Sequence, residues 1–129
     1  MDEHGFIRYV HSKLSPALRK WKIHDTFAGG VPDAYYLGPR SDLWIEYKYV
    51  KALPKRPTTT LKTSLSELQK EWLDDLRRCK RPCALVIGHE QRAVILDQGR
   101  WNTEITTNEF HEASIHRKEL VGWIEFTCL

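Results

Sequence analysis

The stretch that decides the fold runs from residue 29 to residue 50 and reads GGVPDAYYLGPRSDLWIEYKYV. Its aromatic and β-branched residues predict one strand at 33–37 and a second at 42–50, joined by a turn at Gly38-Pro39. Side chains along a strand alternate between the two faces of the sheet. In the second strand, one face carries Leu43, Ile45, Tyr47 and Tyr49, and the other carries Trp44, Glu46 and Lys48.

Glu46 and Lys48 are charged residues in the middle of this apolar strand. The hairpin brings Asp33 near Glu46, and two close carboxylates repel each other unless a proton or a cation lies between them. One or two carboxylates, with water and phosphate, are the usual ligands of Mg²⁺ in proteins. We therefore expect Asp33, Glu46 and the backbone carbonyl of Tyr47 to bind Mg²⁺ or Mn²⁺. Lys48 then lies where an ammonium group orients water or stabilises charge on a phosphate.

The spacing of these residues resembles a known signature. PD at residues 32–33, twelve further residues and EYK at 46–48 are similar to the motif of the PD-(D/E)xK nuclease superfamily. Two shorter motifs, GGV at 29–31 and LSxxQxxWL at 65–73, resemble the VRR-NUC branch, whose members are small nuclease domains found alone or in repair proteins. The resemblance covers about residues 1–97 and implies a restriction-endonuclease-like α/β core with metal-dependent cleavage of DNA.

The resemblance also implies a role for individual residues. Asp33 and Glu46 correspond to the metal ligands, and Lys48 corresponds to the catalytic lysine. Gln69 is expected to support the site from the following helix. An acidic residue of the first helix often joins the metal site in this superfamily, and Glu3 is the best candidate here.

Each assignment has a simpler alternative. Glu46 and Lys48 also fit an ion pair on a solvated strand face, and such exposed pairs contribute little to stability. Gln69 also fits a polar residue at the border of an apolar helix stripe, and Glu3 also fits a frayed terminal residue. The combination of the dyad with Asp33, the glycines and the helix motif favours the catalytic interpretation.

The distribution of charge indicates where a polyanion binds. The net charge of +3 permits a nucleic-acid partner without requiring one. No acidic residue occurs between Tyr47 and Ser66, so residues 51–63 form a long basic loop, which we expect to be mobile. Its cations also fit a role in solubility, but beside a site that cleaves phosphate esters they are natural DNA contacts. The expected nucleic-acid-binding residues are Lys51, Lys55, Arg56 and Lys62.

Hydrophobic periodicity and turn residues predict the remaining elements. The expected helices are 5–14, a second short helix from Ser15-Pro16 through Trp21, a helix opened by a Ser64–Glu67 capping box and ending near Arg78, and a helix opened by a Thr106–Glu109 box and ending near Lys118. The expected further strands are 22–27, 83–88, 92–97 and 121–127. The predicted order α-β-β-β-α-β-β-α-β gives a mixed sheet flanked by helices.

The chain length of 129 residues fits one nuclease domain, in which 98–129 supplies a C-terminal helix and strand that complete the domain or form a dimer interface. Because one site cuts one strand, we expect a homodimer acting on duplex or branched DNA, with resolution of Holliday-type junctions preferred. A restriction or homing endonuclease is a close variant. The sequence also fits a non-catalytic nucleic-acid-binding protein of the same fold, or an interaction module around an exposed Trp101 and Trp123.

Location is inferred from what the sequence lacks. No apolar run reaches membrane-spanning length, the N-terminus lacks the plan of a signal peptide, and the three cysteines have no paired spacing. These features predict a cytoplasmic, intracellular protein without a membrane partner. A phage-encoded or nucleoid-associated protein is compatible with them.

Overall fold

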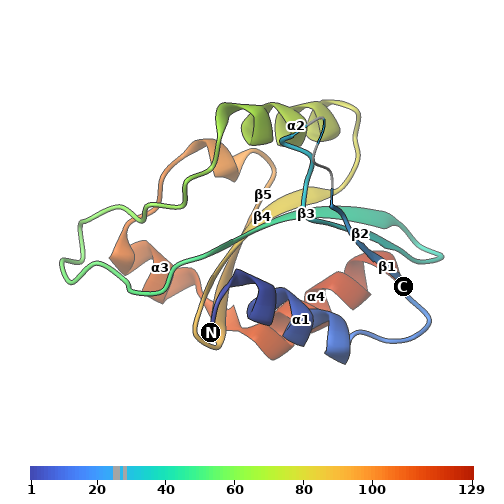
Figure 1. Ribbon diagram of the computed structural model, residues 1–129, viewed down its shortest axis with the longest axis horizontal. Coiled ribbons are helices and arrows are strands. Elements are labelled where there is room, and N and C mark those ends of the chain that lie inside the picture. Colours follow the sequence, from blue (N-terminus) through green and yellow to red (C-terminus); the bar gives the residue numbers. More distant parts are fainter. Residues whose placement is uncertain (25–26, 28) are drawn as a thin grey trace.

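One mixed sheet organises the chain (Figure 1). The structure is a computed structural model and describes residues 1–24, 27 and 29–129. Within these residues, six strands pair in the order β1-β2-β3-β4-β5-β6, and β3 and β4 are parallel while the other neighbours are antiparallel. The strands are β1 (Arg19–Lys22), β2 (Ala34–Leu37), β3 (Asp42–Tyr49), β4 (Cys83–His89), β5 (Arg92–Asp97) and β6 (Ile115–His116).

Helices cover both faces of the sheet, as Figure 1 shows. On one face lie α1 (Glu3–Lys13) and α4 (Arg117–Cys128), and on the other lies α2 (Glu67–Arg78), which connects the parallel strands β3 and β4. The short helices η1 (Arg100–Asn102) and α3 (Thr107–Ala113) add buried side chains to the α2 side. The predicted α/β restriction-endonuclease-like architecture is confirmed, with a mixed sheet between helical layers.

The predicted alternation along β3 is confirmed. Leu43, Ile45 and Tyr47 belong to the core shared with α1 and α4. Trp44 packs into the second core, on the α2 side. Glu46 and Lys48 share the face of Trp44, because residues two apart in a strand point the same way. The face that carries the charged pair is therefore the one beneath α2.

The prediction of a C-terminal strand at 121–127 is wrong. These residues lie in α4, whose side chains Leu120, Val121, Ile124 and Cys128 are buried in the core. The spacing of these four is helical, so the helix buries them on one side. The helix predicted to end near Lys118 ends at Ala113, although its Thr106–Glu109 capping box is confirmed.

The N-terminal region also differs from the prediction. The short helix expected through Trp21 is wrong, because Arg19–Lys22 form β1, an edge strand paired with β2. The strand expected at 22–27 is wrong apart from Lys22, because β1 ends there and Ile23 and His24 lie outside it, and Asp25 and Thr26 of that prediction lie outside the described residues. Backbone pairing with β2 stabilises this polar segment as a strand despite its lack of alternating hydrophobicity.

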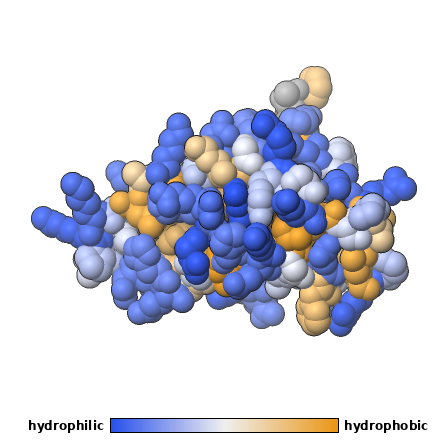
Figure 2. Space-filling model, turned by 90° about the horizontal axis from the view of Figure 1, so that it is seen from below, coloured by the Kyte–Doolittle hydropathy of each residue, from blue (hydrophilic) through white to orange (hydrophobic). Residues whose placement is uncertain are grey.

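The surface over α1 and α4 is mainly hydrophilic. Figure 2 views this face and shows hydrophobic residues in separate groups between polar ones. Among the helices of the described residues, none combines the length and apolar composition needed to cross a membrane. Cys79, Cys83 and Cys128 are all free thiols, as their spacing predicts.

A buried chain of hydrogen bonds links α1 to β2 and β3. His11 Nε2 lies 2.8 Å from the Tyr36 hydroxyl, which lies 2.7 Å from the Tyr47 hydroxyl. Burial lowers the pKa of His11 to about 4, and the charges of Lys20 and Lys22 act in the same direction. The folded protein therefore holds this imidazole neutral.

Acid is expected to destabilise the fold through His11. In the unfolded chain the imidazole takes up a proton near its ordinary pKa of 6.5, whereas the folded protein resists protonation until about pH 4. Stability contributed by neutral His11 is thus present above pH 6.5 and lost as pH falls toward 4. The decrease in the free energy of unfolding between pH 7 and pH 4.5 should be about 2–3 kcal/mol smaller in His11→Gln than in the wild type. Urea unfolding at the two pH values measures it, and an equal loss in both proteins contradicts the assignment.

Candidate active site

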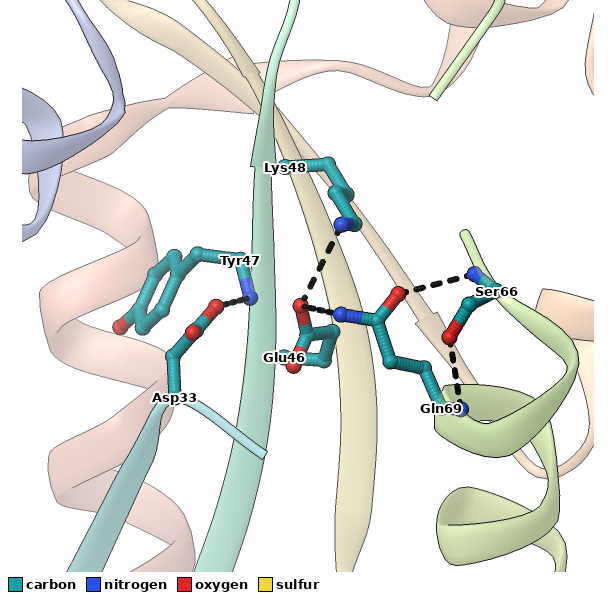
Figure 3. Close-up of polar contacts among 6 residues, drawn as sticks. All are labelled: Asp33, Glu46, Tyr47, Lys48, Ser66 and Gln69. Atoms are coloured by element: carbon teal, nitrogen blue, oxygen red, sulfur yellow. Dashed lines mark hydrogen bonds and ion pairs between the residues drawn. The ribbon is translucent and has the colours of Figure 1, made fainter. Parts of the chain in front are cut away.

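A buried glutamate and a lysine lie side by side on the α2 face of β3 (Figure 3). The Glu46 side chain is only 2% exposed, and that of Lys48 is 16% exposed. Lys48 Nζ lies 3.6 Å from Glu46 Oε2. Burial rules out an ion pair on a solvated strand face, because placing a carboxylate in the interior costs free energy that an exposed pair does not incur.

Asp33 approaches the pair from the neighbouring strand. Because Ala34 is opposite Ile45, Asp33 is the next residue along and reaches the level of Glu46. Its Oδ2 accepts a hydrogen bond of 2.8 Å from the backbone N–H of Tyr47. A strand residue directs its N–H and C=O to the same side, so the Tyr47 carbonyl also faces the side of Asp33. The structure thus brings Asp33 and Glu46, two of the groups predicted as metal ligands, close together beside Tyr47.

Two glycines shape the approach to Asp33. Gly29 and Gly30 have φ values of 66° and 71°, in the left-handed region that favours glycine. A Cβ on Gly30 would lie 2.5 Å from the Leu68 side chain and 2.9 Å from its backbone. The GGV motif therefore lets residues 29–32 pass closely against the start of α2.

Gln69 connects the start of α2 to the candidate site. Its side-chain N–H group donates to Glu46 Oε2 at 3.1 Å, while its Oε1 accepts from the Ser66 N–H at 2.9 Å. Ser66 Oγ in turn accepts from the Gln69 N–H at 3.1 Å. This is a capping box at Ser66 and Gln69, so the box predicted at Ser64 and Glu67 is wrong by two residues.

Ser66 contacts the Gln69 side chain, a contribution to the candidate site that the sequence prediction did not assign to it. The Ser-x-x-Gln pattern at 66–69 was the available signal, since Gln at the third helical position completes a capping box as well as Glu does. The box holds the Gln69 side chain in place, and the remaining amide N–H is directed at Glu46 (Figure 3). The simpler interpretation of Gln69 as a border residue of an apolar stripe is therefore wrong.

The electrostatic environment disfavours an ionised Glu46. Burial raises its pKa to about 9, the charge of Asp33 acts in the same direction, and Lys48 opposes both. Glu46 Oε1 is buried and has no hydrogen-bond partner among the residues that the structure describes. Two carboxyl groups this close favour a proton, or a cation in addition to Lys48, between them.

The donor set fits a hard divalent cation. Asp33 and Glu46 would supply carboxylate oxygens, and Tyr47 would supply a carbonyl oxygen, which are the ligand types that Mg²⁺ or Mn²⁺ prefers. In residues 1–24, 27 and 29–129, no group of three or more His, Cys, Asp or Glu side chains is placed to hold a metal ion. A cation here therefore depends on two carboxylates, backbone oxygen and exogenous ligands, which is the usual arrangement for Mg²⁺ at phosphate substrates.

Glu3 lies near the site without completing a three-carboxylate cluster. It is the first residue of α1 and is half-buried. Burial raises its pKa, the charge of Asp33 raises it further, and Lys48 lowers it. These interactions place Glu3 in the same electrostatic neighbourhood, and they contradict its interpretation as a frayed terminal residue.

The basic loop follows directly from β3. All four residues predicted to bind nucleic acid are exposed: Lys51, Lys55, Arg56 and Lys62. The loop is anchored rather than free over residues 57–61, where backbone hydrogen bonds join Thr59 to Thr107, Pro57 to Asn108 and Leu61 to Ile105. The expectation of a mobile loop is therefore wrong for this part, because its backbone pairs with the start of α3.

The surface proposed for an interaction module is absent where it was predicted. Trp101 is buried, and its Nε1 donates to Asp74 at 2.9 Å. Trp123 is half-buried and packs against the core beneath the sheet. Within the part of the chain that the structure describes, these two tryptophans do not form an exposed apolar patch.

The comparisons with known proteins agree with the fold. No protein-family model matches the sequence, and no curated protein matches it. Among solved structures, the chain is similar to Hjc, a Holliday junction resolvase from the archaeal hyperthermophile Archaeoglobus fulgidus, with a TM-score of 0.60 and 16% sequence identity. The likeness covers 93% of this chain and 95% of that chain. It shows a shared fold, and at this coverage it extends beyond residue 97, where the region covered by the sequence motifs ends.

Proposed function

We propose that this protein is a metal-dependent DNA endonuclease of the PD-(D/E)xK type that hydrolyses phosphodiester bonds in branched DNA. The observation that carries the proposal is the buried Glu46, which lies between Asp33 and Lys48 and whose Oε1 has no hydrogen-bond partner among the described residues. A purely structural site of this kind is costly, whereas a phosphodiesterase needs a metal, a water and a cation together.

The residues have distinct roles in the proposed mechanism. Asp33, Glu46 and the Tyr47 carbonyl would hold Mg²⁺ or Mn²⁺, which would supply Lewis acidity toward the phosphate and lower the pKa of bound water. Lys48 lies beside the carboxylates, where its ammonium group orients the attacking water or stabilises charge on the phosphate. Gln69 keeps Glu46 oriented through its amide N–H. Glu3 adds negative charge near the same position.

Branched DNA is the preferred substrate for two reasons. The similar structure is that of a Holliday junction resolvase, and its fold matches almost the whole chain. The exposed cations at 51, 55, 56 and 62 follow the strand that carries Lys48, where they contact the backbone of DNA bound at the site. A junction has two strands to cut, so we propose a homodimer with one site in each subunit.

A cleavage assay with a panel of DNA structures tests this function. Labelled four-way junction, flap, linear duplex and single-stranded DNA are incubated separately with Mg²⁺, Mn²⁺, Ca²⁺ and EDTA. We expect cleavage with Mg²⁺ or Mn²⁺ only, fastest on the junction, and a dimer mass by light scattering. Sequence-dependent cutting of linear duplex identifies a restriction or homing endonuclease instead. Binding without cleavage under every condition identifies a non-catalytic nucleic-acid-binding protein.

Substitution of Gln69 separates helix capping from positioning of Glu46. In Gln69→Glu the side chain still caps α2, since Glu also completes a capping box, but it no longer donates to Glu46. We expect a rate about 10–100-fold lower, as for residues that orient metal ligands in general, and a lower thermal stability without metal, because a third carboxylate then faces Glu46. Gln69→Ala removes both contacts and should lower the rate and the stability. A Gln69→Glu enzyme with the wild-type rate contradicts the positioning role.

A further inference from the structure

Three aromatic side chains form a row on the sheet face that carries the candidate site. Trp21, Tyr35 and Trp44 lie directly opposite one another in β1, β2 and β3. Residues directly opposite in neighbouring strands share one face of a sheet. The rings of Tyr35 and Trp44 are 4.6 Å apart between centroids, with an interplanar angle of 55°. This aromatic row extends from the middle of the sheet to its β1 edge.

The aromatic row becomes more exposed toward the edge. Tyr35 and Trp44 are half-buried, but Trp21 is 56% exposed. Core packing therefore accounts for Trp44 but not for Trp21. The flank of α2 that contacts Gly30 through Leu68 also carries Trp72, which lines an open cavity of about 210 Å³ on that helix. Aromatic surface thus occurs on the sheet and on the adjacent helix.

The aromatic row lies next to the carboxylates. Asp33 is two residues from Tyr35, and Glu46 is two residues from Trp44, so both share the face of the row. Two residues of a strand rise about 7 Å. One strand of duplex DNA rises about 7 Å over two nucleotides. A phosphate at the carboxylates therefore places a base of the same strand within reach of the aromatic row.

The edge strand combines these aromatics with positive charge. Three of the four residues of β1 are cations, namely Arg19, Lys20 and Lys22. Arg19 is exposed and shares the face of Trp21, whereas Lys20 and Lys22 point to the other face, where Lys22 Nζ forms a hydrogen bond of 2.7 Å with His4 of α1. Aromatic rings with a cation beside them suit the binding of unpaired nucleic acid strands, because the rings stack on bases while the cation neutralises a phosphate.

We propose that the aromatic row is a stacking site for an unpaired nucleobase beside the phosphate that is cleaved. The proposal rests on the proposed function for the position of the substrate strand. Bases inside a duplex already stack on their neighbours, so only a base freed at a branch or a frayed end reaches the row without a cost in unpairing. The site therefore selects strands by local unpairing rather than by sequence.

Binding without metal tests this inference separately from cleavage. Two labelled duplexes of the same sequence are compared in EDTA by fluorescence anisotropy, one fully paired and one with three unpaired nucleotides. The proteins are wild type, Trp21→Ala, Trp21→Phe and the control Phe126→Ala, which removes an exposed aromatic ring from α4 on the other face of the sheet. Melting curves establish that each variant is folded.

Trp21→Ala is expected to bind the duplex with unpaired nucleotides about tenfold more weakly, within the range measured for loss of one base–aromatic stack. Its affinity for the paired duplex should stay within about twofold, as should every affinity of Phe126→Ala. Trp21→Phe should retain most of the affinity for unpaired nucleotides, since it keeps a ring.

Equal weakening of binding to both DNAs in Trp21→Ala overturns the stacking site. A Trp21→Ala protein that loses subunit association but binds unpaired nucleotides as tightly as the wild type also overturns it. If the wild type cuts DNA and Trp21→Ala binds both DNAs normally, the stacking site is overturned but the proposed endonuclease function is retained. If the wild type cuts none of the DNAs and Trp21→Ala still binds unpaired nucleotides more weakly, the stacking site is supported and the endonuclease function is refuted.

Discussion

Glu46→Gln is expected to abolish cleavage and, without metal, to yield a more stable protein than the wild type. The substitution removes a buried carboxyl group that faces Asp33 and has one oxygen without a hydrogen-bond partner in the described part of the chain. Removal of such a group stabilises the folded protein by about 1–3 kcal/mol. Loss of a metal ligand at a phosphodiesterase site costs several kcal/mol of transition-state stabilisation, or roughly a thousandfold in rate.

The gain in stability should depend on pH. The ordinary pKa of a glutamate is 4.5, and in the folded protein burial raises the pKa of Glu46 to about 9. Between these values the folded state binds more protons than the unfolded state, so the wild type loses stability as pH rises. The glutamine does not titrate. The advantage of Glu46→Gln should therefore be small near pH 4.5 and grow toward pH 9.

Urea unfolding in EDTA at pH 5, 7 and 8.5 measures this difference. Glu67→Gln is the matched control, because Glu67 is 88% exposed at the start of α2 and should change stability by less than about 0.5 kcal/mol. Added Mg²⁺ should stabilise the wild type and not Glu46→Gln, since only the wild type binds it. A Glu46→Gln protein that is less stable than the wild type at every pH contradicts the electrostatic account of the site.

Lys48→Met is expected to lower the cleavage rate by about 10²–10³-fold, as is typical of residues that stabilise charge in the transition state. Its side chain is 16% exposed and lies beside Glu46, and methionine preserves much of its length without the charge. Because Lys48 is not a metal ligand in this account, the variant should still bind Mn²⁺. Lys48→Met should therefore lose the chemical step but keep metal binding, whereas Glu46→Gln should lose metal binding.

Single-turnover kinetics on the preferred DNA distinguish this role from a general electrostatic effect. Lys70→Met is the control, because Lys70 is a half-buried lysine on α2 that pairs with Glu67 rather than with the carboxylates of the site. Lys48→Arg should not restore the rate, since a planar guanidinium is a poor substitute for a compact ammonium that orients water. A Lys48→Met enzyme with wild-type turnover refutes the catalytic role.

The central part of the fold was predictable because its signals are local. The alternation along residues 42–50 fixes the two faces of β3, and the turn at Gly38-Pro39 fixes the hairpin that carries Asp33 to Glu46. The chemical identity of Asp33, Glu46 and Lys48 then indicated a metal-dependent site. Their assembly in the structure follows from strand register, which the sequence encodes directly.

The start of α2 was harder to predict because two capping boxes overlap. Ser64 and Ser66 each precede an acidic or amide residue by three positions. Ser64 has a φ of 59°, in the left-handed region, whereas an N-cap has an extended backbone. The contact between Gln69 and Glu46 joins residues 23 positions apart. It depends on the packing of α2 on the sheet, which local sequence rules do not include.

The helix predicted at 5–14 is confirmed by α1 at Glu3–Lys13, but β1 and α4 were predicted poorly for a different reason. β1 consists of Arg19–Lys22, has no alternating pattern and depends on pairing with β2. In residues 117–128, the aromatic and β-branched composition favoured a strand, but burial of Leu120, Ile124 and Cys128 follows the helical period. In both segments tertiary contacts outweigh intrinsic propensity.

Calorimetric titration of the metal-free protein with Mn²⁺ tests the central claim most directly, because it reports on the carboxylate pair without DNA or turnover. Wild type should bind one Mn²⁺ per chain with release of a proton at pH 7, since the ion replaces the proton that the raised pKa of Glu46 retains. Glu46→Gln and Asp33→Asn should lose this binding, and Glu67→Gln should keep it. Binding that is absent in the wild type, or equal in wild type and Glu46→Gln, would show that the buried pair is not a metal site.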